Sequence, residues 1–196
     1  PIEFTYKNNK SIFHQREVNE DTRSFSAALR AALREDPDVI LVGELRDLET
    51  IQLAISAAET GHLVFGTLHT SSAAQTVDRM VDVFPPAQQT QIRVQLSSSL
   101  LAVFSQTLCK RLRPLPGQFG RVISLEIMVN TPAIANLIRE GKTAQIYSQI
   151  QTSAKEGMIT LERSLANLVR DEAINRAEAM LKSTRQEELE RLLIQG

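Results

Sequence analysis

One stretch, residues 36–70, constrains the fold more than any other part of the chain. It opens with the apolar run VILV at 39–42, which is typical of a strand buried on both faces of a sheet. An acidic turn follows, and then an amphipathic segment for which Asp47 is a candidate N-cap and Gly61 a candidate C-terminal stop. A second apolar run lies at 62–68. A strand, a crossover helix and another strand predict a parallel β-α-β unit and therefore an α/β fold.

Two polar residues, Glu44 and His69, follow the ends of these predicted strands. Ligands of parallel sheets bind beyond the carboxyl ends of the strands, so we expect both side chains at the same edge. Their chemistry suggests phosphoryl transfer, because the carboxylate could orient or deprotonate a water and the imidazole could sense or bind a terminal phosphate. The pattern alone leaves two alternatives open, that Glu44 is a turn carboxylate and that His69 is a polar residue at a helix start.

Composition narrows the class of protein. Hydrophobic residues make up 42% of the chain and charged residues 23%, an ordinary balance for a globular domain. The formal net charge of −1 provides no basic field for nucleic acid. No apolar run approaches the roughly 20 residues that span a bilayer, and no secretory signal is visible. The single cysteine, Cys109, excludes an internal disulfide and a cysteine-rich zinc site, which fits a reducing cytoplasm. Because the first residue is Pro1 rather than Met, we expect a piece of a longer chain, cut upstream.

The regions on either side of the central stretch are predicted to be extended before it and mainly helical after it. One helix is expected between Asp21 or Thr22, as its cap, and Pro37. Another is expected from Pro86 to about Leu112. The other predicted elements are strands at 2–6, 11–18 and 121–129, a loop at 113–120, and helices at 73–84, 132–140, 143–152, 159–170, 174–182 and 184–194.

Arginines at 23, 30 and 34 fall on one face of the helix before Pro37. Such a stripe is usually a solvated basic face. The alternative is that one or more of these arginines reach a phosphate bound at a neighbouring subunit or lobe, where a guanidinium offsets the charge of the transition state.

Gly141-Lys142-Thr143 resembles the end of a phosphate-binding P-loop, G-x-x-x-x-G-K-[ST]. However, Asn136 stands where the first glycine belongs, and the preceding segment is predicted to be helical rather than a strand. We therefore reject it, and no other P-loop occurs in the sequence.

Three runs carry a family resemblance: HQREV at 14–18, ALRAALREDPDVILVGELRDLET at 28–50 and TGHLVFGTLHT at 60–70. They closely resemble the type II/type IV secretion ATPase superfamily, and within it the twitching-motility ATPases that retract type IV pili. The resemblance implies a RecA-like (P-loop NTPase) core over residues 1–129, incomplete at its N-terminus, and an all-helical C-terminal subdomain over 130–196. It also implies that a PAS-like domain and the P-loop are missing upstream.

The same resemblance implies roles on the nucleotide side of the site. ILVGE is similar to the family's Walker B segment, so Glu44 would be the catalytic carboxylate and would organise Mg²⁺ indirectly, with Gly43 beside it. TGHLVFGTLHT is similar to the His box, in which His69 would contact the γ-phosphate. PIEF at 1–4 resembles the tail of the Asp box, of which Glu3 would remain near the nucleotide.

The arginine fingers of the family lie in the region that matches Arg16 and the helix bearing Arg30 and Arg34. We favour Arg16 and Arg30 as catalytic, and we expect Arg34 among the residues that bind ATP.

Two features favour the retraction branch over assembly ATPases. The region where assembly relatives carry a tetracysteine zinc module has only Cys109. The retraction motif AIRNLIRE matches AIANLIRE at 133–140, with Ala135 in place of the first arginine; a divergent paralogue would also fit this change. The matching residues are Ala133, Ile134, Asn136, Leu137, Ile138, Arg139 and Glu140.

The resemblance thus implies part of a homo-oligomeric, six-membered ring that hydrolyses ATP with Mg²⁺ to drive pilus retraction. Such a ring would work in the cytoplasm at the inner-membrane base of the pilus, against the inner-membrane platform protein and attached to the membrane only through partners. We expect no nucleic acid and no metal cluster.

Without a P-loop, the chain alone is expected to be inactive. The alternatives are a non-enzymatic assembly or regulatory module, a related pilus-assembly or type II secretion ATPase, and, more weakly, a RecA-like nucleic-acid motor. With seven Phe, two Tyr and no Trp, the chain offers few platforms for stacking bases, which argues against the last.

Overall fold

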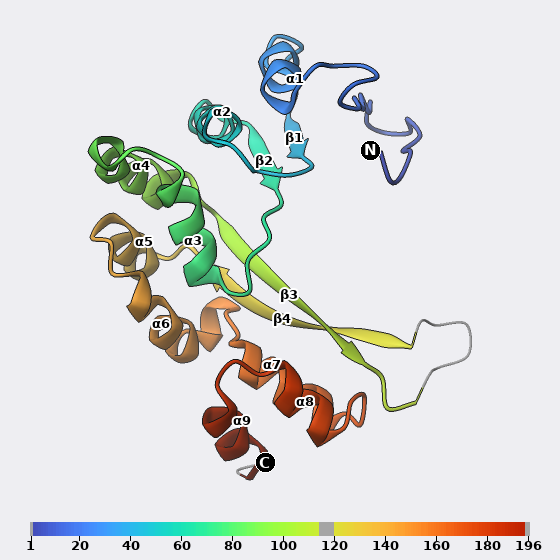
Figure 1. The fold of residues 1–196 in the computed structure, drawn as a ribbon, viewed down its shortest axis with the longest axis vertical. Helices are drawn as coiled ribbons and strands as arrows, with labels where there is room; N and C mark the ends of the chain where they lie inside the picture. The colour runs from blue at the N-terminus through green and yellow to red at the C-terminus, as the bar shows by residue number, and fades with distance from the viewer. Residues whose placement is uncertain (1, 114–119, 195–196) are drawn as a thin grey trace. The chain divides into compact units, whose positions relative to one another are not determined.

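The computed structural model describes residues 2–113 and 120–194 (Figure 1). The chain divides into two compact units, one up to Leu68 and one from His69 onward. The subdomain boundary implied by the family resemblance, at 129/130, is a different division and stays a prediction.

The first unit contains the expected β-α-β arrangement. Strands β1 and β2 pair in parallel, with Val39 opposite Leu63 and Val42 opposite Gly66, and helix α2 connects them. Asp47 is the N-cap of α2, as predicted, and Gly61 adopts a positive φ of 105° just after the helix. The elements of this unit are α1 (Phe25–Ala32), β1 (Val39–Val42), α2 (Leu48–Glu59) and β2 (Leu63–Gly66).

Strand β1 is buried on one face only, contrary to the expectation of burial on both. Ile40 and Val42 are buried, whereas Val39 and Leu41 are exposed. A parallel strand is covered on both faces only where packing elements lie on both sides of its sheet. Leu63 and Phe65 of β2, the partners of Val39 and Leu41, are exposed as well, so the uncovered apolar face extends across both strands.

The strands predicted at 2–6 and 11–18 are wrong. Within the described residues, this segment forms no strand, and only an isolated bridge joins Val18 to Thr22. Side chains accept hydrogen bonds from backbone N–H groups that would otherwise pair with a neighbouring strand. Gln15 Oε1 accepts from the N–H of Tyr6, and Asn8 Oδ1 accepts from the N–H of Phe13.

The cap of α1 was also placed too early. Ser24, not Asp21 or Thr22, accepts a hydrogen bond from the N–H of Ala27. Asp21 instead accepts a hydrogen bond from the N–H of Glu17.

The second unit combines a two-stranded antiparallel sheet with helices. Strand β3 pairs with β4 along its whole length, from Ala102 opposite Val129 to Lys110 opposite Arg121. The elements are α3 (Ala73–Asp82), α4 (Pro86–Ser99), β3 (Ala102–Lys110), β4 (Arg121–Val129), α5 (Pro132–Arg139), the 3₁₀ turn η1 (Thr143–Gln145), α6 (Ile146–Thr152), the 3₁₀ turn η2 (Ala154–Glu156), α7 (Leu161–Arg170), α8 (Arg176–Lys182) and α9 (Gln186–Ile194).

The long helix predicted from Pro86 to about Leu112 is wrong in its second half. Helix α4 ends at Ser99, Leu100 adopts extended φ and ψ of −65° and 131°, and β3 follows. Burial then alternates along the strand, with Val103 buried and Phe104 exposed, which is the period of a strand rather than of a helix. The predicted strand at 121–129 and the helices beyond it are confirmed; most of the predicted loop at 113–120 lies outside the described residues.

The last three helices pack against the hairpin around one apolar cluster. The cluster contains the buried Cys109 of β3 together with Leu161 and Leu165 of α7 and Leu189 of α9. Burial raises the pKa of the Cys109 thiol, which keeps it protonated.

Gly141-Lys142 forms the C-terminal cap of α5 rather than a phosphate loop. The N–H of Lys142 donates to the carbonyl of Leu137 at 2.9 Å, and the N–H of Gly141 donates to that of Ile138 at 3.1 Å. Gly141 has a φ of 69°, so the segment is a Schellman cap. The structure therefore supports the rejection of a P-loop here.

Candidate nucleotide-hydrolysis site

The carboxyl edge of the β1–β2 pair carries the predicted catalytic turn. The pairing continues past the strands, because the N–H of Leu45 donates to the carbonyl of Thr67 at 2.9 Å. The hydroxyl of Thr67 donates to the carbonyl of Gly43. Gly43 and Leu45 are thus both tied to the neighbouring strand end, and the residue between them, Glu44, is held at this edge.

The Glu44 carboxylate is mostly buried, with 18% of its side chain exposed, and it lies 2.5 Å from Nε of Arg46. This contact raises the pKa of the Arg46 guanidinium. Arg46 belongs to none of the predicted site residues. The only sequence signal for its contact with Glu44 is its position two residues later, in the same turn.

His69 opens the second unit and is exposed. The three residues after His69 lead into α3, and hydrogen bonds to residues of that helix fix their positions. Ser72 is the N-cap and accepts from the N–H of Gln75 at 3.2 Å. The hydroxyls of Thr70 and Thr76 are 2.7 Å apart. Because Glu44 and His69 belong to different units, their expected convergence on one phosphate stays a prediction.

Each of the two favoured finger arginines is held by a carboxylate of its own unit. Arg16 pairs with Glu35, whose other oxygen lies 3.2 Å from Nδ1 of His14. Arg30 of α1 pairs with Glu49 of α2 at 2.6 Å. The hydrogen bond from Arg16 is the largest influence that lowers the pKa of Glu35, and the hydrogen bond from Arg30 acts in the same way on Glu49.

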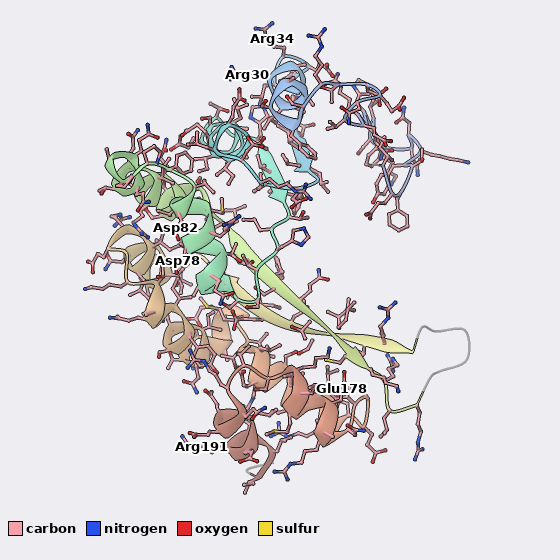
Figure 2. All side chains as sticks on the ribbon, in the orientation of Figure 1. Arg30, Arg34, Asp78, Asp82, Glu178 and Arg191 are labelled. Atoms are coloured by element: carbon pink, nitrogen blue, oxygen red, sulfur yellow. The ribbon has the colours of Figure 1, made fainter. Side chains whose placement is uncertain are left out.

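Arg34 and Glu3 are both exposed. Figure 2 shows Arg30 on α1 and Arg34 just beyond the end of that helix. Glu3 lies in the irregular segment before α1. The structure thus leaves the roles of both residues as predictions.

The expected retraction motif forms helix α5 and its cap. Ile134 and Ile138 are completely buried, whereas Asn136 and Arg139 are exposed. Ala135, which replaces the arginine of the family motif, is half-buried. The motif therefore has a packing face and a solvent face, and only the second is available to a partner.

Comparison with known proteins identifies the class of protein. Residues 1–191 match the family described as Type II/IV secretion system protein, and the chain belongs to this family.

Among its relatives is the type IV pilus retraction ATPase PilT of Pseudomonas aeruginosa, with 58% identity over 183 residues, which cover 93% of this chain and 52% of that protein. A twitching motility protein of Neisseria gonorrhoeae is 57% identical over 170 residues, covering 87% of this chain and 44% of that protein. The chain spans about half the length of the curated relatives that it matches.

Solved structures agree with this assignment. The crystal structure of the pilus retraction motor PilT with bound ADP matches 97% of the chain and 52% of that protein, with a TM-score of 0.87 and 51% identity. The ATPase DotB of Legionella pneumophila matches 84% of the chain and 43% of that protein, with a TM-score of 0.72 and 27% identity. The expected fold class, a RecA-like α/β core followed by a helical part, is confirmed.

Proposed function

We propose that this chain is part of a homohexameric ATPase motor that retracts type IV pili, and that it supplies the catalytic carboxylate of the hydrolysis site. The observation that carries the proposal is the position of Glu44, held at the carboxyl edge of a parallel strand pair by bonds from Thr67 and Leu45. This edge is where α/β sheets bind their ligands.

The Glu44 carboxylate, with 18% of its side chain exposed at the strand edge, is the donor that this chain would offer to Mg²⁺–ATP. Among the described residues, no group of three His, Cys, Asp or Glu side chains is placed to hold a metal ion. Mg²⁺ needs no such group, because it keeps several waters and is commonly bound through one or two carboxylates and the phosphates of a nucleotide. Glu44 is the residue that would meet its water shell.

The chain's own residues would divide the work of hydrolysis. Glu44 would orient the attacking water and accept its proton, while His69 would contact the terminal phosphate. Arg16 and Arg30 would offset the charge that develops on the phosphoryl oxygens. Bound Mg²⁺–ATP supplies the phosphoryl group and the divalent charge.

The arginines must first leave their present partners. Both ion pairs are at least partly exposed, with 62% of the Arg30 side chain accessible. Ion pairs that water reaches in this way are screened and contribute little to stability. Exchange of Glu35 or Glu49 for a phosphate on a neighbouring subunit is therefore inexpensive.

The exposed apolar face of β1 and β2 supports the idea that a P-loop-bearing segment completes the core. Val39, Leu41, Leu63 and Phe65 line this face in cross-strand register. Contiguous exposed apolar surface usually marks an interaction site. In a complete motor, we propose that the covering segment belongs to the part of the protein that corresponds to the unmatched half of the relatives.

The motor would work in the cytoplasm at the inner-membrane base of the pilus and would act on the platform protein there. None of the helices in the described ranges combines the length and apolar character needed to cross a bilayer.

The test is Glu44→Gln in the full-length protein. We expect binding of a fluorescent ATP analogue to persist and phosphate release to fall by roughly 10²- to 10⁴-fold, the usual contribution of a general base. Glu20→Gln, in the exposed segment before α1, is the matched control and should keep turnover. Unchanged turnover in Glu44→Gln would remove Glu44 from the proposed role.

A second measurement separates the motor from a non-enzymatic module. Residues 1–196 alone should release no phosphate from ATP in a malachite-green assay, and the full-length protein should release it. A full-length protein that binds its partners but hydrolyses nothing would favour the assembly or regulatory alternative.

A further inference from the structure

Glu126 is a buried carboxylate that none of the proposed chemistry uses. It lies on β4 with only 4% of its surface exposed. Its Oε1 accepts a hydrogen bond from the N–H of Ala73 at 2.8 Å, across 53 positions of sequence. Burying a carboxylate is costly unless it is well hydrogen-bonded, so this contact is a specific feature of the fold.

Ala73 is the first residue of α3, whose opening N–H groups have no partner inside the helix. Ser72 satisfies the N–H of Gln75, and Glu126 satisfies that of Ala73. The negative charge also lies at the positive end of the helix dipole. Two hydrogen-bond acceptors therefore fix the beginning of α3: its own N-cap, and a carboxylate on β4, a strand that is far away in the sequence.

The same part of β4 also holds the start of α7. Ile127 and Ile159 exchange backbone hydrogen bonds of 2.9 and 3.1 Å, and Leu125 donates to Ser164 Oγ at 3.1 Å. Helix α7 begins at Leu161, between these two anchors. Glu126 thus sits where the strand meets the beginnings of two helices.

Burial is the main cause that raises the pKa of Glu126, and the Glu162 carboxylate raises it further. The N–H groups of Ala73 and Leu161 act in the opposite direction. Glu162 is itself completely buried on α7, where it accepts from Tyr147 and from the N–H of Arg185, just before α9. Two neighbouring carboxylates therefore link the beginnings of α3, α7 and α9.

We propose that Glu126 is a positioning residue for His69: by fixing the first turn of α3 against the C-terminal helices, it sets the location of the segment from His69 to Ser72. Only three residues separate His69 from Ala73, so a shift of the helix start moves the imidazole with it. The inference rests on the proposed role of His69 at the terminal phosphate.

The experiment is a double-mutant cycle in the full-length protein, with ATP turnover and ATP affinity measured for each variant. Glu126→Ala should lower kcat roughly tenfold or more, since misplacement by about 1 Å can cost as much as 10²-fold. The KM for ATP should change little. Glu126→Gln, which keeps an oxygen for the Ala73 N–H, should retain most of the turnover.

The decisive comparison introduces Glu126→Ala into a protein that already carries His69→Ala. If Glu126 acts through His69, Glu126→Ala should lower kcat no further in the His69→Ala protein. Additive losses would overturn the inference while leaving the role of His69 intact. Unchanged turnover in His69→Ala alone would instead overturn the proposed role of His69 and, with it, this inference.

A purely structural effect is controlled by Leu189→Ala, which opens a cavity in the cluster between α7 and α9. It should lower the unfolding temperature without lowering the kcat of folded protein, and a loss of kcat equal to that of Glu126→Ala would refute a specific role. Should Glu126→Ala fail to fold, Glu126→Asp replaces it in the cycle, because the shorter side chain withdraws its oxygen from Ala73 but keeps the charge.

Discussion

The side chain of Leu45 occupies the space beside Gly66, at the end of β2, where any other residue would place a Cβ atom. A Cβ atom at position 66 would lie 2.5 Å from Cδ1 and 2.9 Å from Cγ of Leu45. Leu45 is 9% exposed and is bonded through its backbone to Thr67. The residue before it is Glu44, so the packing of this one leucine supports the turn that carries the proposed catalytic carboxylate.

Gly66→Ala is expected to destabilise the first unit and to lower turnover. Overpacking costs about 1–3 kcal/mol, which exceeds the roughly 0.4–1 kcal/mol that replacing a glycine gains through the unfolded state. Urea denaturation and phosphate release measure the two effects. Gly120→Ala, where a Cβ would meet nothing within 4 Å, is the control and should be neutral or slightly stabilising. Equal behaviour of the two variants would contradict this account.

Asp47→Ala should weaken the start of α2. Asp47 accepts from both the N–H and the hydroxyl of the buried Thr50, each at 2.9 Å. Loss of an N-cap of this type costs about 0.5–2 kcal/mol. Asp47→Asn keeps an acceptor and should retain most of the stability in chemical denaturation. A stable Asp47→Ala protein would show that packing alone holds this helix.

Titration of Glu35 should reveal its partnership with Arg16. The pKa of Glu35 is lowered in the folded chain, so its ion pair stabilises the fold above the unfolded-state pKa, and this contribution is lost as the pH falls through the folded-state value. Carbon-detected NMR of the labelled carboxyl should show a pKa below the ordinary value for Glu.

Arg16→Gln should move the Glu35 pKa back towards that ordinary value, because Arg16 is the largest cause of the shift. Arg23→Gln is the control, since Arg23 does not contribute to the lowered pKa of Glu35. A Glu35 pKa that is the same in the Arg16→Gln and unmutated proteins would contradict the pairing.

The two faces of α5 should respond differently to substitution. Ile138→Ala removes a completely buried side chain and should cost about 2–5 kcal/mol. Arg139→Ala, on the exposed face, should change stability by no more than about 0.5 kcal/mol. If the exposed face meets a partner during retraction, Arg139→Ala should lower twitching motility at unchanged stability. Full motility in that variant would show that Arg139 makes no contact with a partner that retraction requires.

Local patterns of sequence sufficed for several features. The β-α-β unit, the Asp47 cap and the strand at 121–129 follow from runs and spacings within a few residues of one another. The false phosphate loop could be rejected in the same way, because Asn136 stands where its first glycine belongs and a helix, α5, precedes it. These features depend on short-range physics: alternation, capping and backbone conformation.

Other predictions failed because the deciding partner lies elsewhere in the chain. Leu96, Leu100 and Val103 are spaced as on a helix, yet Val103 belongs to a strand whose ladder with β4 is not visible in that local window. The segment at 2–18 contains strand-like residues, but without a neighbouring strand its backbone bonds to side chains instead.

By itself, the sequence determined the central α/β unit, the family, and the candidate residues Glu44 and His69, because these rest on contiguous motifs. Tertiary structure decided what surrounds them: the pairing of Arg16 and Arg30 with acids, the leucine under the Glu44 turn, and the contact between Glu126 and Ala73. A glutamate within an apolar strand shows no partner in its own neighbourhood. Only the folding of β4 against the beginning of α3 brings the carboxylate to the free N–H group that makes its burial tolerable.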